Sequence, residues 1–372
     1  MNILVTGGGG FLGGAIVRML RERGHVVTVL SRGRYPELER AGIKSVQADI
    51  RDAAAVRAAC AGMDAVIHTA AIAGIWGPKK LFWDINCHGT QNVLAACRDA
   101  GVQHLVYTSS PSVVFGTKEL CGVAESQPYP AKYLAHYPAS KAAAERAVLD
   151  ANDATSEHLP RSNSQPNGIS GARLPSQPNA AHKGRRYIQS GPPLKTVALR
   201  PHLIFGPGDP HLFPRIIARA KQQKLVQVGP GTNLVDVTYV DNAAAAHVLA
   251  LENLTTSATC AGKAYFISQG APVNLWSWLR DILSRLELPP PRGPISARTA
   301  NLLGAAFEAV YGMLHINSEP RLTRFLAGQL ATSHYFDISG ARRDFGYAPR
   351  ISTSEATDRL VDWLRSQPKA AL

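Results

Sequence analysis

Short apolar runs alternate with segments of helical periodicity along the N-terminal half of the chain. Runs that are short and rich in β-branched residues predict buried strands. They are NILV (2–5), HVVTVL (25–30), IKSVQADI (43–50), DAVIHTAA (64–71), HLVYTSS (104–110) and TVALRPHLIFG (196–206). The segments between them, such as AAAVRAAC (53–60), predict crossover helices. This alternation predicts an α/β fold with a doubly wound parallel sheet, the Rossmann architecture.

The alternation weakens after the last of these runs. The segment that starts with KLVQVGPG (224–231) is hairpin-like, and a helix is predicted to begin near Asp241. Residues 274–288 have the pattern of an amphipathic helix. The strongly apolar run 301–316 predicts a core helix, or alternatively a wall for an apolar substrate that touches a membrane surface.

This change of pattern divides the chain into two predicted regions. The first is a Rossmann domain over 1–250. The second is a smaller C-terminal substrate lobe over 251–372, interleaved with 207–235. A chain of 372 residues is long enough for one large domain with such a lobe.

The composition is that of an ordinary soluble globular protein, 45% hydrophobic and 18% charged. No apolar run approaches the length of about 18 residues that a membrane span needs. The N-terminus enters a strand directly, without a basic leader, which argues against a secretory signal. The five cysteines, odd in number and without metal-ligand spacing, predict reduced thiols, a cytoplasmic location and no metal site.

The net charge of +13 is partly local. Residues 155–195 hold six basic residues against one acid, Glu157, together with six prolines. Such a segment cannot bury a core and predicts a disordered or loosely held surface insertion; an acidic partner for it is the alternative. Nucleic acid is not a predicted partner, because no basic run is interleaved with aromatic residues.

The first predicted strand leads into a glycine-rich turn and an amphipathic helix. Gly7, Gly10 and Gly13 follow the pattern G-x-x-G-x-x-G. The first glycine allows a tight turn, the second a close approach to a pyrophosphate, and the third close packing of helix on strand. Unpaired N–H groups at the helix start attract phosphate. We predict dinucleotide binding here, with Phe11 and Leu12 of the same turn in the site.

The end of the second predicted strand indicates which dinucleotide binds. An NAD site usually places a carboxylate there to bind the ribose 2′-hydroxyl. This chain instead has SRGR, with Ser31, Arg32 and Arg34 and no acid. Because an arginine clamps a 2′-phosphate, NADP is the predicted cofactor and NAD the alternative. A solvated basic turn is the non-functional interpretation.

Further coenzyme contacts are predicted where the third and fourth strands end. Asp49 is placed to reach adenine, with Ile50 beside it. Ala70 leaves room for the backbone to approach the coenzyme. Each residue also fits plain loop chemistry, and only its position at the carboxyl end of a strand favours function.

The stretch HYPASK (136–141) places a tyrosine and a lysine at the start of a predicted helix. Tyr137 and Lys141 are four residues apart, so their side chains lie on one helical face. A cation near the phenol favours the phenolate, which makes Tyr137 a candidate proton donor or acceptor. The alternative to a catalytic pair is a non-functional one. In that case the tyrosine is a surface residue, and the aliphatic part of the lysine side chain lies along the protein surface.

The ordered motifs resemble a known enzyme group. In chain order they are TGGGGFLG (6–13), ADI (48–50), HTAA (68–71), NCHGT (86–90), YTSSPSVVFG (107–116), YPASK (137–141) and LRPHLIFGPGD (199–209). This set resembles the extended short-chain dehydrogenase/reductase superfamily. YTSSPSVVFG and NLVDVTYVDNAAAAH (233–247) are similar to its 3β-hydroxysteroid and sterol dehydrogenase branch.

The resemblance implies roles for individual residues. Tyr137 would exchange a proton with the substrate oxygen, and Lys141 would hold the nicotinamide ribose and lower the pKa of that tyrosine. Ser110 would hydrogen-bond the substrate oxygen. Asn86 resembles the asparagine that supports the active-site backbone, and it joins the predicted coenzyme set. Hydride transfer to a ketone leaves an alkoxide that needs such donors.

Two features leave the serine assignment open. An extra valine in SVVFG shifts the alignment, so Ser109 and Ser112 are alternatives to Ser110. Pro111, a departure from the family pattern, is expected to change the direction of the serine. The 155–195 segment is a second departure, and it leaves the predicted cofactor site intact.

The predicted function is hydride transfer between a nicotinamide and a secondary alcohol or ketone of a hydrophobic substrate. The resemblance implies a 2-alkyl-3-oxoalkanoate or a 3β-hydroxysteroid-like molecule, and a homodimer. A nucleotide-sugar epimerase or dehydratase is the first alternative. A catalytically silent NADP-binding sensor or scaffold is the second. Peripheral contact with a membrane is compatible with the apolar run near the C-terminus.

Overall fold

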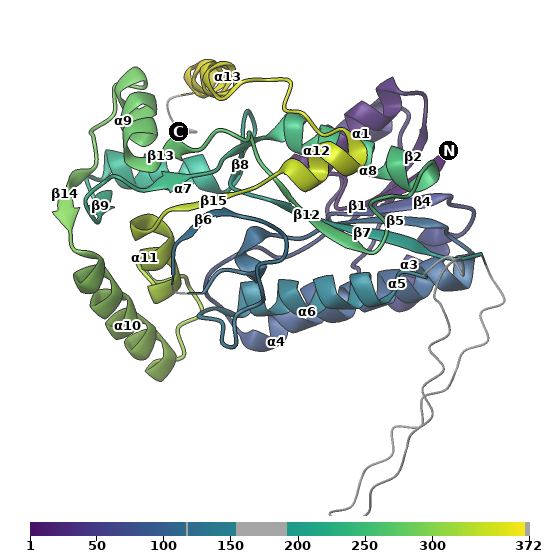
Figure 1. Cartoon of the computed structure of the whole chain (residues 1–372), viewed down its shortest axis with the longest axis horizontal. Coiled ribbons are helices and arrows are strands. Elements are labelled where there is room, and N and C mark those ends of the chain that lie inside the picture. The colour runs from purple at the N-terminus through teal and green to yellow at the C-terminus, as the bar shows by residue number, and fades with distance from the viewer. Residues whose placement is uncertain (117, 154–191, 369–372) are drawn as a thin grey trace, which may run out of the picture.

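The structure is a computed structural model that describes residues 1–116, 118–153 and 192–368. The predicted insertion at 155–195 lies outside the described residues except for its last four positions. Those last positions lead into a strand of the central sheet. Figure 1 shows the central sheet between two layers of helices, with a second group of elements to one side.

Seven strands form the central sheet in the order β12-β7-β5-β4-β1-β2-β3, and each neighbouring pair is parallel. The strand order reverses between β1 and β4, which is the switch point where doubly wound sheets bind ligands. The predicted fold class is therefore confirmed. The strands are β1 (Asn2–Thr6), β2 (Val26–Ser31), β3 (Lys44–Gln47), β4 (Ala65–His68), β5 (His104–Thr108), β7 (Lys195–Pro201) and β12 (Lys263–Ile267).

Helices cover both faces of this sheet (Figure 1). One layer contains α1 (Phe11–Glu22), α8 (Val240–Thr255) and α12 (Ser339–Phe345). The other contains α3 (Ala53–Cys60), α4 (Lys79–Phe82), η1 (Trp83–His88), α5 (Gly89–Ala100) and α6 (His136–Asp150). Two short helices, α2 (Pro36–Arg40) and η2 (Pro111–Val113), lie in the loops after β2 and β5. Crossover helices on both faces explain why the strands read as continuous apolar runs.

The second group of elements draws on distant parts of the chain. Its strands are β6 (Leu120–Val123), β8 (Ile204–Phe205), β9 (Val226–Val228), β10 (Leu234–Val235), β11 (Thr238–Tyr239), β13 (Val273–Asn274), β14 (Arg292–Ile295) and β15 (His334–Phe336). They form a sheet in the order β13-β10-β15-β6 and two strand pairs, β11-β8 and β14-β9. Its helices are α7 (Leu212–Lys221), α9 (Leu275–Arg285), α10 (Ala297–Met313), α11 (Arg324–Ala331) and α13 (Thr353–Ser366).

Two details of the predicted second region differ from the structure. The hairpin-like segment forms no hairpin, because β9 pairs with β14 while β10 pairs with β13 and β15. The central sheet also extends past residue 250, since β12 is its outermost strand beside β7. Both differences arise because strand partners come from distant parts of the chain. The division into two domains itself stays a prediction.

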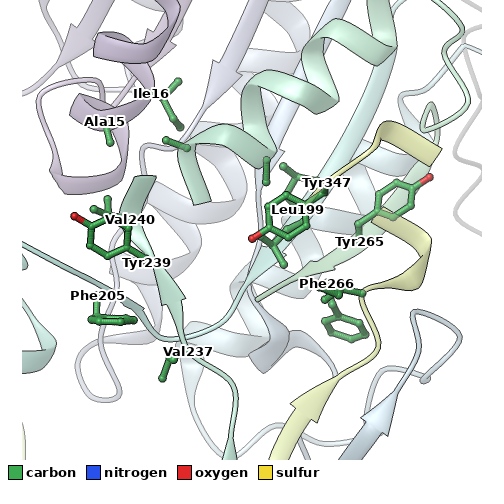
Figure 2. Packing of buried hydrophobic residues seen from close by; sticks show 14 of the residues in the cluster. Ala15, Ile16, Leu199, Phe205, Val237, Tyr239, Val240, Tyr265, Phe266 and Tyr347 are labelled. Atoms are coloured by element: carbon green, nitrogen blue, oxygen red, sulfur yellow. The ribbon is translucent and has the colours of Figure 1, made fainter. Parts of the chain in front are cut away.

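A continuous apolar core joins the central sheet to the second group of elements. Figure 2 shows Ile16 of α1, Leu199 of β7 and Phe266 of β12 within this core, together with Tyr347 from the loop after α12. All four side chains are fully buried. The apolar runs of the strands and the apolar face of α1 therefore meet as the sequence predicts.

Helix α10 departs from the predicted core helix. The buried residues of α10 are Ala300 and Gly304. The helix approaches the start of α11 closely at Gly304, where a larger side chain would not fit. The large apolar side chains of the outward face are exposed: Leu302, Leu303, Val310 and Met313, with Leu314 just beyond the helix end. The prediction of a core helix is wrong for this run. Among the described helices, none has both the length and the apolar character needed to cross a bilayer.

Candidate active site

A crevice of about 640 Å³ lies at the carboxyl ends of the central strands. It extends from the glycine-rich turn after β1 to the first turns of α6. The predicted coenzyme-binding and catalytic residues that line it are Gly7, Gly10, Phe11, Leu12, Gly13, Ser31, Arg32, Asp49, Ile50, Ala70, Ser110, Tyr137 and Lys141. Asn86 does not line the crevice. The carboxyl ends of parallel strands meet at one edge, which is why loops far apart in sequence converge here.

The glycine-rich turn fits a dinucleotide. Gly7 has a φ of +74°, a conformation that residues with a Cβ rarely adopt. A Cβ on Gly13 would overlap the carbonyl group of Gly7, so α1 can approach β1 closely only with a glycine there. Helix α1 begins just after Gly10 and directs its first N–H groups at the crevice. The turn therefore leaves a cradle for a pyrophosphate.

The far end of the crevice combines cationic and anionic side chains. The Ser31 hydroxyl accepts a hydrogen bond from the Gly9 N–H at 3.2 Å, and Arg32 is exposed on the rim. The Asp49 carboxylate binds Arg51 through both oxygens, at 3.0 and 2.8 Å. This contact lowers the pKa of Asp49 from its ordinary value. Asp49 is therefore an ionised carboxylate paired with Arg51, and Arg32 lies near it on the rim of the crevice.

Tyr137, Lys141 and Glu145 repeat every four residues along one face of α6. Tyr137 and Ser110, which lies in the loop after β5, line the crevice together, close enough for the Ser110 side chain to lower the pKa of the phenol. The Lys141 ammonium donates to the carbonyl of Thr108 at 2.6 Å and lies 4.3 Å from the centre of the Tyr107 ring. Glu145, one turn further, is fully buried in a two-point ion pair with Arg200 of β7. Because these side chains share one face of the helix, α6 contacts β5 through Lys141 and β7 through Glu145, and Tyr137 lies beside the loop after β5.

Ser110 is the serine whose side chain acts on the pKa of Tyr137, and the other two candidates have other surroundings. Its catalytic role stays a prediction. The Ser112 hydroxyl lies 2.9 Å from the Ser110 hydroxyl, so it supports Ser110 from the side away from the crevice. Ser109 lines the crevice, but its side-chain oxygen has no partner among the described residues. The predicted effect of Pro111 on the direction of the serine stays a prediction. Pro111 opens the short helix η2, and the Ser112 N–H binds the Ser110 side-chain oxygen at 3.2 Å.

Burial controls the proton equilibria of this group. Burial lowers the pKa of Lys141 to about 7, and the charge of Glu145 opposes that shift. Burial raises the pKa of Tyr137, while the hydrogen bond with Ser110 lowers it. This reverses the predicted lowering of the tyrosine pKa, because loss of hydration disfavours the phenolate. Tyr137 is therefore a neutral phenol at neutral pH, which is the form required to donate a proton.

Asn86 acts one layer behind the crevice. Its side chain accepts from the Ile72 N–H at 2.8 Å and donates to the Ile72 carbonyl at 3.0 Å. It also donates to the Ser140 hydroxyl at 3.0 Å, and Ser140 in turn binds the Tyr137 carbonyl at 2.8 Å. The structure thus gives Asn86 contacts that support the active-site backbone, as the family resemblance implied. Asn86 does not line the crevice, and its predicted contact with the coenzyme stays a prediction. Asn86 lies in the π-helical turn η1, a feature often found near functional sites.

Several crevice residues were absent from the sequence prediction. They include Tyr35, Thr69, Ile85, Thr108, Pro201, Leu203, Ile204 and Leu212. Pro201 ends β7 and Leu203 and Ile204 follow it, so their position at the carboxyl end of a strand was a signal that they line the site. Tyr35 had no such signal. Its ring packs directly against Gly9, a contact that depends on the path of the loop after β2.

Comparison with known proteins agrees with this site. The sequence pattern of the 3-beta hydroxysteroid dehydrogenase/isomerase family matches residues 4–171 and 180–294. The chain belongs to this family. The 2-alkyl-3-oxoalkanoate reductase of Stenotrophomonas maltophilia (strain K279a) is 45% identical over 362 residues, which cover 97% of this chain and 98% of that protein. The decarboxylating sterol-4-alpha-carboxylate 3-dehydrogenase of Mus musculus is 33% identical over 360 residues, with 96% and 89% covered.

Solved structures share the fold at lower identity. A UDP-glucose-4-epimerase from Stenotrophomonas maltophila with bound NAD has a TM-score of 0.70 and 22% identity, and 98% of each chain is covered. MoeE5 in complex with UDP-glucose and NAD has a TM-score of 0.67 and 23% identity, with 98% and 99% covered. These likenesses concern the fold alone.

The family membership confirms three predictions. They are the 3β-hydroxysteroid dehydrogenase branch of the short-chain dehydrogenase/reductase superfamily, the enzyme class of NAD(P)-dependent dehydrogenases or reductases, and a nicotinamide cofactor. The choice of NADP over NAD stays a prediction. The roles of the individual residues in this family member stay predictions as well.

The preference for NADP predicts the effect of replacing Arg32. Loss of a charge-assisted hydrogen bond to the 2′-phosphate, worth about 1.5–3 kcal/mol, should raise the KM for NADPH about 10–100-fold in Arg32→Ala. The KM for NADH should stay within about twofold of wild type, because NADH lacks that phosphate. Arg40→Ala, an exposed arginine of α2 outside the crevice, is the matched control. An unchanged ratio of the two KM values in Arg32→Ala would reject the NADP assignment.

The buried lysine predicts a pH dependence of stability. A lysine titrates near 10.5 in the unfolded chain, and the pKa of Lys141 is about 7 in the folded protein. Between these values the unfolded chain binds the extra proton, so the free energy of unfolding rises with pH. Relative to Lys141→Met, the wild-type value should rise by up to about 1.4 kcal/mol per pH unit from about pH 7 to 9. Urea unfolding without added coenzyme measures this difference. Parallel pH profiles for the two proteins would contradict it.

Proposed function

We propose that the protein is an NADP-dependent reductase of a hydrophobic 2-alkyl-3-oxoalkanoate. The observation that carries the proposal is the position of the Ser110–Tyr137 pair, which lines both the dinucleotide crevice and an adjoining apolar cavity. A ketone held by these two hydroxyls has one side towards the coenzyme and the other towards apolar walls. The high identity with the Stenotrophomonas maltophilia reductase over nearly the whole chain supports the substrate class.

The bound nicotinamide supplies the hydride in this reaction. Ser110 and Tyr137 bind the carbonyl oxygen and polarise the bond towards it. As negative charge develops on that oxygen, Tyr137 donates its phenolic proton, and the phenolate that forms is stabilised by the nearby Lys141 ammonium. Lys141 is held by Thr108 on one side and is placed to bind the ribose hydroxyls on the other. Proton uptake from solvent then restores the phenol.

The chemistry of the lysine supports this sequence of steps. A pKa near 7 lets Lys141 change its protonation state at the working pH. It can therefore stabilise the tyrosinate after the transfer and take part in reprotonation. The buried Glu145–Arg200 pair keeps α6 in register, so that Tyr137 and Ser110 remain within reach of one oxygen.

The finer statements on partners and location are proposals too. We propose a cytoplasmic homodimer, as the family resemblance implies, and a peripheral membrane contact through the exposed apolar side chains of α10. All five cysteines are free thiols, which suits a reducing compartment. Sedimentation equilibrium tests the dimer, and flotation with anionic vesicles tests the membrane contact. A monomer in the first experiment, or no co-flotation in the second, would reject the corresponding proposal.

Replacing the catalytic phenol tests the proposed function. Tyr137→Phe removes the proton donor and should lower kcat for NADPH-dependent reduction of a 2-alkyl-3-oxo acid by about 10²–10⁴-fold. The loss of absorbance of reduced nicotinamide measures the rate. Tyr133→Phe is the matched control, because Tyr133 binds the Val113 carbonyl at 2.9 Å and lies outside the crevice. Its kcat should stay within a few-fold of wild type.

Two results would favour the alternatives. Equal activity of Tyr137→Phe and wild type would point to a silent NADP-binding sensor or scaffold. Turnover of a UDP-sugar without net consumption of NADPH would point to a nucleotide-sugar epimerase.

A further inference from the structure

A cavity of about 160 Å³ adjoins the dinucleotide crevice on the far side of the catalytic hydroxyls. Ser110, Tyr137, Pro201 and Leu203 line both spaces. We name this cavity the aromatic subsite. Its apolar walls are Pro111, Phe115, Pro201, Leu203, Phe325 and Phe336. They come from the loop after β5, the loop after β7, helix α11 and strand β15. The subsite therefore exists only where both groups of elements meet.

The aromatic side chains hold one another at fixed angles. The rings of Phe115 and Phe325 meet edge to face with centroids 5.7 Å apart. Phe336 meets His202 in the same manner at 5.3 Å. Phe115, Phe325 and Phe336 are each almost fully buried. The walls are thus preformed, and little ordering is needed when an apolar group enters.

Two buried histidines form part of the polar wall, which also includes Ser110, Ser112, Tyr137 and Gln329. The Nε2 of His334 lies 2.8 Å from the Gln329 carbonyl, and its Nδ1 lies 2.7 Å from the Nε2 of His202. A carbonyl only accepts, so His334 carries its proton on Nε2 and its Nδ1 accepts from His202. Burial lowers the pKa of both histidines. The pair is therefore neutral, and among the described residues no lysine or arginine lines the subsite.

A cavity with an aromatic wall and without a cationic side chain among its described lining residues selects one side of a 3-oxo acid. The carbonyl carbon of such a substrate bears two groups: a plain hydrocarbon chain, and the carbon that carries the carboxylate. Burying a carboxylate without a cation is strongly unfavourable, whereas burying a hydrocarbon chain is favourable. We propose that the aromatic subsite binds the hydrocarbon chain on the oxo side of the substrate, so that the carboxylate-bearing carbon points away from it. This assignment rests on the proposed reductase function.

The size of the subsite sets a chain length. An apolar cavity of about 150 Å³ holds a benzene ring, so one of this volume accommodates about six carbons. Phe325 closes the subsite from the α11 side. Its position makes it a residue that determines specificity for chain length, with no part in the proton transfer.

Phe325→Ala tests the assignment by opening the subsite. Two substrate series are compared, one lengthened on the oxo side and one lengthened at the 2-alkyl position. In Phe325→Ala, kcat/KM for oxo-side chains longer than about six carbons should rise at least tenfold relative to short chains, since each methylene in a fitted pocket is worth about tenfold or more. The 2-alkyl series should keep its wild-type profile. Leu326→Ala, on the same helix but outside the subsite, should change neither series.

A second variant keeps the test decisive if Phe325→Ala folds poorly. Gln329 lines the subsite, is only partly buried, and contributes its backbone carbonyl to His334. Gln329→Trp preserves that carbonyl and fills the space. It should lower kcat/KM at least tenfold for oxo-side chains of several carbons and leave methyl ketones within about twofold of wild type.

The possible results separate the two proposals. Methyl esters of the oxo-side series should respond to both variants as the free acids do. A response limited to the free acids would place the carboxylate in the subsite and overturn the inference. Turnover with an unshifted oxo-side profile in both variants, or a shift of the 2-alkyl series alone, would overturn only the inference. Absence of NADPH consumption by the wild-type enzyme with every 3-oxo acid would overturn the proposed function and the inference together.

Discussion

The burial of the Lys141 ammonium beside β5 is the constraint on which the site depends. A buried cation is tolerated only with close compensation, and here a backbone carbonyl, the Tyr107 ring and the more distant Glu145 provide it. Because Lys141 is fixed against β5, the tyrosine one turn earlier on α6 has to face the end of that strand. The serine that follows the strand then meets Tyr137. The position of the Tyr137 hydroxyl is thus a consequence of where the Lys141 ammonium is buried.

The same hydroxyl pair separates two spaces of different chemistry. On one side is the dinucleotide crevice, with its glycine turn and the exposed Arg32. On the other side is the aromatic subsite, where His202 and His334 bind one another and Ser112 binds Ser110. A reacting carbonyl placed between them is bound by donors at its oxygen and by apolar walls at its chain. The polarity of each space, rather than any single contact, orients the substrate.

Local chemistry explains why most of the coenzyme site was predictable. Gly7 and Gly13 are needed where backbone segments approach closely, and such requirements leave a mark in the sequence itself. Tyr137 and Lys141 share a helical face whatever surrounds the helix. The direction of the tyrosine pKa was not predictable in this way. It depends on how completely the phenol is buried, and burial is a property of the assembled protein. The exposed apolar face of α10 was misread for the same reason, since an apolar run does not reveal whether a neighbour covers it.

The sequence by itself determined the alternation of strands and helices, the glycine turn and the spacing of the catalytic pair, because each rests on contacts within a few residues. Only the tertiary structure decided that Ser110 lies beside the tyrosine, that Asn86 binds the backbone behind the crevice, and that Phe115, Phe325 and Phe336 enclose one cavity. Those arrangements join residues more than two hundred positions apart in the longest case. Contacts of that kind form only when the central sheet and the second group of elements pack together. They cannot be predicted from a local sequence pattern.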